Sequence, residues 1–192
     1  MKRISVLSLF LTVLCASSVW AEGWTKDLEL GGGACFELAL GDMNEHETGN
    51  VGFNVEAAMP LPLRLSGDGL VSAVGLSAQT GVLFPVGKKS YIDSWWALDL
   101  ALGAYVDLRL NQVITVRPEA AFDIRLNSVK SEEKNVSGMF ADYGARIGAT
   151  VLLDMLKNGV IFKAGADYVL LPEKDSICHY VGMNIGAVYR FN

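Results

Sequence analysis

Residues 181–191 read VGMNIGAVYRF, and every second residue in this stretch is apolar. The apolar positions run from Val181 to Phe191, and the positions between them are small or polar apart from Val188. Successive side chains of a β-strand point to opposite sides, so this alternation predicts a strand with two unlike faces.

The same alternation recurs in seven earlier stretches of the chain. They cover residues 28–40, 51–63, 70–84, 96–108, 114–126, 139–151 and 160–170. Each is as long as the roughly 9–11 residues that a tilted strand needs to cross a bilayer. Hydrophobic residues make up 51% of the chain, yet beyond the N-terminal region no apolar run approaches the roughly 18 residues of a spanning helix. The pattern predicts an all-β fold, an eight-stranded antiparallel up-and-down transmembrane β-barrel.

The N-terminus has the layout of a secretory signal peptide. Lys2 and Arg3 provide the charge, residues 4–16 the apolar core, and residues 19–21 a small-residue cleavage site. We therefore predict a signal peptide at residues 1–21 and one barrel domain at residues 22–192. The alternative is a lipoprotein acylated at Cys15, but Leu14 is bulky where that processing requires a small residue.

Charge and cysteine content narrow the possible partners. The formal net charge is −5, and about −7 without Lys2 and Arg3, which argues against nucleic-acid binding. Cys35 and Cys178 remain after signal removal. The predicted register places Cys178 opposite residues near Leu40, several positions from Cys35, so two free thiols are favoured over a disulfide.

The connections between the predicted strands alternate in character. Residues 41–50, 85–94, 128–138 and 172–176 are long or polar, whereas residues 66–69, 110–112 and 154–158 form short turns. Outer-membrane barrels carry long loops outside and short periplasmic turns, so we expect both termini in the periplasm. Because proline cannot donate to a β-ladder, Pro60 and Pro62 predict that their strand ends near Met59, and Pro118 is expected near a strand start or at a bulge.

A soluble lipocalin-like barrel would also alternate, with its apolar face turned inward. Two features favour a membrane barrel here. The apolar face carries no charged residue on any strand, and the opposite face mixes charges with many glycines and alanines. A crowded interior requires small residues, whereas a face in contact with water does not. The apolar face is therefore expected to face lipid.

The enclosed face carries both arginines and carboxylates. Buried charges must be paired, so we predict a salt-bridged polar network filling the lumen, with a selective conduit as the alternative. Its predicted members are Glu29, Glu37, Glu56, Asp99, Asp107, Arg109, Arg117, Glu119, Asp123, Arg125, Asp142, Arg146, Lys163, Asp167 and Arg190.

Aromatic residues near strand ends are typical of the interfacial girdles of membrane proteins. Those expected at the outer rim are Phe53, Phe84, Tyr91, Trp95 and Trp96, and those expected at the inner rim are Trp24, Tyr189 and Phe191.

The ending Gly186-Ala187-Val188-Tyr189-Arg190-Phe191 resembles the terminal strand of the small eight-stranded outer-membrane barrels of the OmpA, OmpX and OmpW kind, and most closely that of OmpW. The resemblance implies that Tyr189 and Phe191 form the signal read by the barrel-assembly machinery, although Asn192 follows the terminal aromatic. It also implies a narrow barrel admitting small hydrophobic molecules, but the lumen pattern shows no clear apolar pocket.

The remaining motifs give no catalytic, cofactor or metal site. His179 stands near Asp175 and Ser176, but adjacency in sequence is not triad geometry, and His46 with Glu45 and Glu47 lacks metal-ligand spacing. The charged loop residues 44–47 and 130–134 are expected to be solvated. We predict no enzyme activity and no cofactor, with outer-membrane lipid as the main partner. Three roles stay open: a narrow conduit, a surface protein that binds host ligands through residues 42–50 and 129–136, or a structural barrel.

Overall fold

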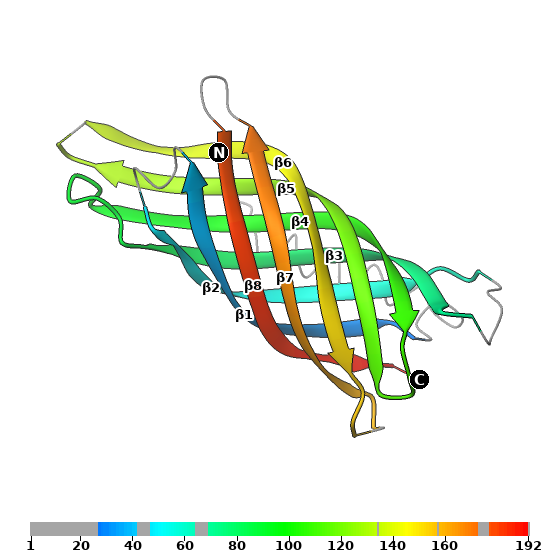
Figure 1. The fold of residues 1–192 in the computed structure, drawn as a ribbon. Helices are drawn as coiled ribbons and strands as arrows, with labels where there is room; N and C mark the ends of the chain where they lie inside the picture. The colour runs from blue at the N-terminus through cyan, green and yellow to red at the C-terminus, as the bar shows by residue number, and fades with distance from the viewer. Residues whose placement is uncertain are drawn as a thin grey trace, which may run out of the picture.

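The computed structural model describes residues 27–41, 47–63, 69–133, 135–156, 158–172 and 177–191. These residues form a closed antiparallel barrel in which each strand pairs with the next and the last pairs with the first (Figure 1). The predicted eight-stranded all-β fold is confirmed. The strands are β1 (Glu29–Gly41), β2 (Gly49–Pro60), β3 (Val71–Val86), β4 (Ser94–Arg109), β5 (Ile114–Ser131), β6 (Val136–Leu153), β7 (Val160–Pro172) and β8 (Ile177–Arg190).

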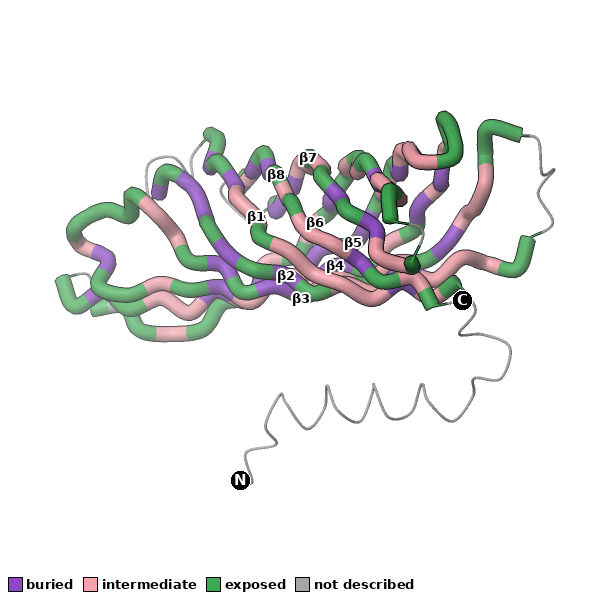
Figure 2. The backbone as a smooth tube through the Cα atoms, turned by 90° about the horizontal axis from the view of Figure 1, so that it is seen from below, coloured by how far each residue is buried: buried purple, intermediate pink, exposed green. Residues whose placement is uncertain are grey.

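The two faces of the barrel wall differ as the alternation predicts. Exposed and buried residues alternate along the strands (Figure 2). Phe53, Leu102 and Ile185 are 71%, 64% and 66% exposed on the outside, whereas Asp123 and Arg125 are 0% and 1% exposed within. The large apolar side chains therefore point away from the lumen, and the charged side chains point into it. Among the described residues no helix is long and apolar enough to cross a membrane.

The barrel closes between β1 and β8, where the two strands approach closely. Gly33 pairs with Gly186, and a Cβ on Gly33 would collide with the backbone oxygen of Ile185. Cys178 lies opposite Gly41, and Cys35 lies opposite Asn184. Cys35 and Cys178 do not form a disulfide with each other, as the register predicts.

The two ends of the barrel are named here by what they hold. The terminal end contains Asp27, Phe191 and residues 61–63, 69–70, 110–113, 154–156 and 158–159. The loop end contains residues 47–48, 87–93, 132–133 and 135.

The predicted alternation of long loops and short turns is wrong in two places. β5 and β6 continue to Ser131 and from Val136, so most of residues 128–138 is paired strand and not loop (Figure 1). Backbone pairing needs no apolar side chains, so this hairpin extends through polar sequence. Conversely, the connection between β2 and β3 spans residues 61–70 and is longer than the predicted turn at residues 66–69.

The prolines explain part of this difference. β2 ends at Pro60, as predicted, and Leu61 makes one further bond when its N–H donates to the oxygen of Val74 at 2.8 Å. Pro118 is the fifth of the 18 residues of β5, near the strand start, and it keeps the register with β6, so of the two predicted placements the bulge is absent there. The β4–β5 ladder instead omits the pairs beside Pro118, because proline has no N–H to donate.

Several sequence predictions fall outside the described residues. They are the signal peptide at residues 1–21 with Cys15, the aromatic Trp24, the loop residues Glu45 and His46, Asp175 and Ser176 near His179, and the final Asn192. These stay predictions.

Candidate functional site: the charged lumen

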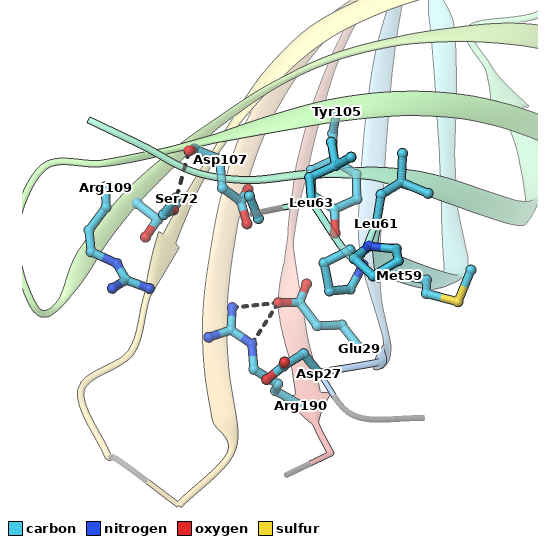
Figure 3. A pocket seen from close by; sticks show the side chains of 14 residues that line it. Asp27, Glu29, Met59, Leu61, Leu63, Ser72, Tyr105, Asp107, Arg109 and Arg190 are labelled. Atoms are coloured by element: carbon cyan, nitrogen blue, oxygen red, sulfur yellow. Dashed lines mark hydrogen bonds and ion pairs between the residues drawn. The ribbon is translucent and has the colours of Figure 1, made fainter. Parts of the chain in front are cut away.

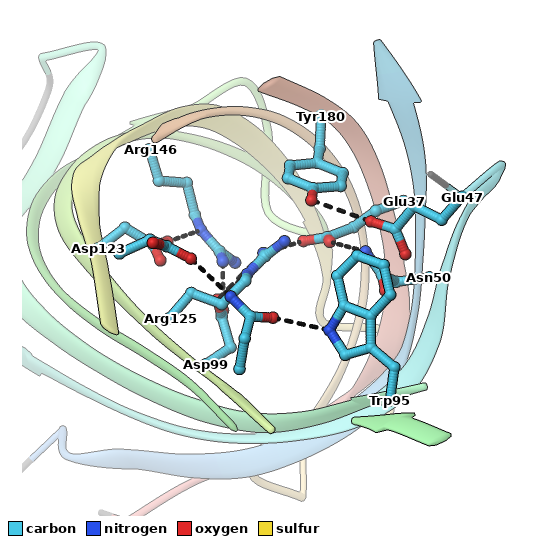
Figure 4. Close-up of polar contacts among 11 residues, drawn as sticks. Glu37, Glu47, Asn50, Trp95, Asp99, Asp123, Arg125, Arg146 and Tyr180 are labelled. Carbon is cyan, nitrogen blue, oxygen red and sulfur yellow. Dashed lines mark hydrogen bonds and ion pairs between the residues drawn. The ribbon is translucent and has the colours of Figure 1, made fainter. Parts of the chain in front are cut away.

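Five side chains form an ion-paired group in the loop-end half of the lumen, called here the central network. They are Glu37, Asp99, Asp123, Arg125 and Arg146, contributed by β1, β4, β5 and β6 (Figure 4). Arg125 Nη2 lies 2.9 Å from Glu37 Oε1 and 3.1 Å from Asp99 Oδ1. Arg146 bonds the second oxygen of Asp99, and its Nε lies 2.8 Å from Asp123 Oδ2. Asp99 therefore bridges the two guanidinium groups.

Amide and aromatic side chains surround the central network. Asn50 donates to Glu37 Oε2 at 3.1 Å. The guanidinium carbon of Arg125 lies 4.6 Å from the centre of the Tyr180 ring, a cation–π contact. Asn127 accepts from the Trp95 indole at 3.0 Å and donates to Asp142 at 2.6 Å, which extends the polar contacts to the loop end.

Glu47 contradicts the sequence expectation of a solvated loop. Only 1% of the residue is exposed, and its Oε1 accepts a hydrogen bond from the Tyr180 hydroxyl at 2.9 Å (Figure 4). Its second oxygen is buried and has no hydrogen-bond partner among the described residues. Burial raises the pKa of Glu47 to about 7, against the lowering effects of the Tyr180 hydrogen bond and the charge of Arg125.

A second ion-paired group, the terminal-end cluster, comprises Glu29, Asp107, Arg117 and Arg190. Arg117 binds both oxygens of Asp107, at 2.7 and 2.9 Å, and its Nη1 lies 2.7 Å from Glu29. Arg190 Nε donates to the other oxygen of Glu29 at 3.0 Å. The Arg117 guanidinium also lies 4.0 Å from the centre of the Tyr105 ring. Fork-shaped pairing of this kind satisfies both charges at once.

The other predicted lumen residues lie in separate contacts. Lys163 pairs with Glu56, Ser77 donates to Glu119 at 2.6 Å, and Asp142 accepts from Asn127. Asp167 accepts a long 3.5 Å bond from Asn184. Arg109 is exposed at the terminal end and belongs to neither group. The single lumen network predicted from the sequence is thus divided into two groups and several pairs.

The sequence analysis missed three residues that contact the two groups, Asn50, Tyr105 and Tyr180, and a fourth, Glu47, that contacts Tyr180. Continuing the alternation of residues 181–191 backwards would have placed Tyr180 on the enclosed face beside Gly182 and Asn184. The same extension reaches Tyr105 between Gly103 and Asp107 on β4. Glu47 has no such signal, because it lies in the connection between β1 and β2, where the alternation does not apply.

The predicted aromatic girdle is only partly formed as expected. Trp96 and Phe84 are exposed on the outside at 40% and 49%, but Trp95 points into the lumen and bonds Asn127. Phe53 lies within β2 and not at its end. At the terminal end, the rings of Tyr189 and Phe191 meet edge to face with centroids 5.0 Å apart.

His179 makes a 2.7 Å hydrogen bond with Tyr168 through Nδ1.

A cavity of about 530 Å³ lies at the terminal end of the lumen (Figure 3). One wall is apolar and consists of residues 59–63 with Tyr105, and the other carries Glu29, Asp107, Arg109 and Arg190. The cavity is thus half polar and does not amount to a clear apolar pocket. Its apolar wall was not foreseen, because strand alternation does not describe the segment after β2 that lines the mouth.

The lumen leaves little free space beside the central network. The void beside Asp99 and Arg146 measures about 10 Å³, which is the space of a single water molecule. It is lined also by Asn54, Asp167 and Asn184, each of which has a buried polar atom without a hydrogen-bond partner among the described residues.

Comparison with known proteins is informative at the level of structure. No protein-family model matches the chain, and no curated protein matches it significantly. Neisserial surface protein A is 12% identical with a TM-score of 0.63, and the match covers 85% of this chain and 97% of that one. Ail, the attachment invasion locus protein of Yersinia pestis, is 15% identical with a TM-score of 0.59, covering 86% and 99%. OprG, an outer membrane protein of Pseudomonas aeruginosa, is 10% identical with a TM-score of 0.56, covering 88% and 97%.

At these identities the comparisons establish the fold and nothing finer. The resemblance predicted from the alternating strands and the C-terminal ending is confirmed at that level. The chain has the fold of the small eight-stranded outer-membrane β-barrels.

Proposed function

We propose that the chain is an integral outer-membrane protein whose lumen is a narrow conduit held closed by the central network. The support for membrane insertion is the outer surface, where large apolar side chains such as Leu102, Phe122 and Ile147 are more than half exposed. Monomeric soluble proteins rarely expose a continuous apolar belt, whereas a lipid-facing wall requires one. The loop end would then face outward and both termini the periplasm.

The single observation that carries the closed state is the burial of Arg125 at 1% exposure, between Glu37 and Asp99. The void beside these two carboxylates measures only about 10 Å³, room for a single water molecule. Below it, the 530 Å³ cavity opens at the terminal end. Passage of a solute past the central network therefore requires its ion pairs to separate.

Conductance across planar bilayers tests this proposal. The double variant Glu37→Ala with Arg125→Ala removes one acid and one base, and leaves Arg146 to pair with Asp99 and Asp123. We expect the unmodified barrel to give a current near the baseline and the double variant to conduct. Arg109→Ala is the matched control because it removes an arginine at the rim, outside the central network.

Two results would contradict the proposal. One is a steady ionic current through the unmodified barrel. The other is a double variant that folds, as judged by heat-modifiable mobility on a gel, and yet conducts no more than the Arg109→Ala control.

The alternative role, binding of surface ligands, concerns the β5–β6 hairpin. Its described tip carries an exposed ion pair between Lys130 and Glu132 at 2.6 Å. One structural neighbour, Ail, has been solved in complex with the heparin analogue sucrose octasulfate. Transplanting residues 129–136 onto an inert barrel tests this role. Ligand binding that moves with these residues would support it, and a transplanted barrel that does not bind would contradict it.

A further inference from the structure

The loop-end opening of the lumen holds a carboxyl group that the proposed conduit does not require. Glu47 precedes β2 and reaches over the lumen to the Tyr180 hydroxyl on β8. The backbone of the next residue, Thr48, is bonded to the strands on either side of β2. Ala39 N–H donates to Thr48 O and Thr48 N–H donates to Val86 O, each at 3.0 Å. The position of Glu47 is therefore held by β1, β3 and β8.

Among the described residues, the groups that face Glu47 come from four strands. Tyr180 of β8 donates to it, Arg125 of β5 attracts its charge, Glu37 of β1 repels it, and the Asn50 amide of β2 favours its ionised form. Behind them lie Asp99, Asp123 and Arg146.

The charge balance of this region is acidic. Arg125 and Arg146 are already bound by Glu37, Asp99 and Asp123, so that two guanidinium groups serve three carboxylates before Glu47 is counted. An ionised Glu47 would add a buried anion with one oxygen left unpartnered, and such a charge is costly. Protonation removes the cost and keeps the hydrogen bond with Tyr180.

We propose that Glu47 is a pH-responsive latch over the loop end of the lumen, closed on Tyr180 when its carboxyl group is protonated and released into water when it ionises. The direction of the pH dependence follows from the raised pKa of Glu47 in the closed form. The closed form binds a proton that the released form, with an ordinary carboxyl pKa near 4.5, gives up. The closed form is therefore favoured at acidic pH and is lost as the pH rises through about 7.

The released state would open the loop end of the lumen beside Tyr180. Tyr180 and Cys178 are 2% and 3% exposed and belong to one buried group with Ala39, Val169 and Leu171. Cys178 thus provides a native reporter. Its rate of modification by a small cationic methanethiosulfonate reagent measures the access of water to the loop end of the lumen.

The experiment uses the barrel in detergent micelles in a Cys35→Ala background, so that Cys178 is the reactive thiol of the barrel. Glu47→Gln is the matched variant, because the amide has the shape of the protonated acid and cannot ionise. Comparing the two proteins at each pH cancels the ionisation of the thiol itself. We expect the rate in the protein with Glu47, divided by the rate in the Glu47→Gln protein, to rise roughly thirtyfold between about pH 5.5 and about pH 8.5.

A third protein tests whether the Glu47 side chain itself limits access of the reagent to Cys178. Glu47→Ala removes the latch and is expected to react faster than the Glu47→Gln protein at both pH values, provided that it shows the heat-modifiable mobility of a folded barrel. A ratio between the Glu47 and Glu47→Gln proteins that stays constant with pH would overturn the proposal. So would slow modification of the Glu47→Ala protein. Neither result depends on whether the lumen conducts, so failure of the latch and failure of the proposed conduit are distinguishable.

Discussion

At the scale of single residues, the central network offsets the free-energy cost of burying the charged Arg125 side chain. Arg125 is enclosed by Glu37, Asp99 and the Tyr180 ring, so its charge is paired and its flat face is covered. Truncating one member of a buried pair leaves the partners charged and unsatisfied. We expect Arg125→Ala to lower the free energy of unfolding by about 3–5 kcal/mol.

Urea titration of the folded barrel in lipid vesicles, followed by gel mobility, measures this loss. Arg109→Ala serves as the control, because Arg109 is exposed and outside both ion-paired groups, and a change within about 0.5 kcal/mol is expected for it. Equal losses in the two variants would show that the contacts of Arg125 contribute no special stability.

At the scale of elements, closure of the barrel depends on the β1–β8 seam. Gly33 and Gly186 face each other there, and a Cβ added to Gly33 would lie 2.9 Å from the Cα of Gly186 and would collide with the oxygen of Ile185. Gly33→Ala should therefore strain the seam and lower stability by about 1–3 kcal/mol.

The fraction of folded protein after dilution from urea, read from gel mobility, measures this effect. Gly138→Ala is the matched control in β6, where the nearest atom to an added Cβ is 3.4 Å away on the Phe140 ring. If both variants fold equally well, the seam does not require a glycine at position 33.

At the scale of the whole molecule, the orientation of the wall decides whether the barrel is a membrane protein. Leu102 is 64% exposed in the middle of β4, and Leu110 is 59% exposed in the connection after it. If lipid surrounds the wall, Leu102→Arg should lower stability by about 2–4 kcal/mol, and Leu110→Arg, near the interface, by at most about 1 kcal/mol.

Unfolding in vesicles gives both values. A barrel surrounded by water would tolerate both substitutions alike, so equal and small effects would remove the support for membrane insertion. The same pair of variants in a soluble fraction prepared without detergent would then be expected to stay folded.

The sequence by itself determined the number of strands, their antiparallel order and which face points outward. These properties depend on a period of two residues, which is a local property of each strand, and on the need of a lipid-facing wall for apolar side chains at every outward position. The tertiary structure alone decided which charges meet. Arg117 binds Glu29 and Arg125 binds Glu37 across the lumen, although each pair is 88 residues apart in sequence.

Such pairs depend on the register accumulated over all the strands between them, which alternation does not specify. For the same reason the sequence analysis treated Glu47 as solvated, since only the closed barrel brings Tyr180 beneath it. The extension of β5 and β6 through polar residues was equally out of reach, because it arises from backbone pairing, to which side-chain hydrophobicity gives no guide.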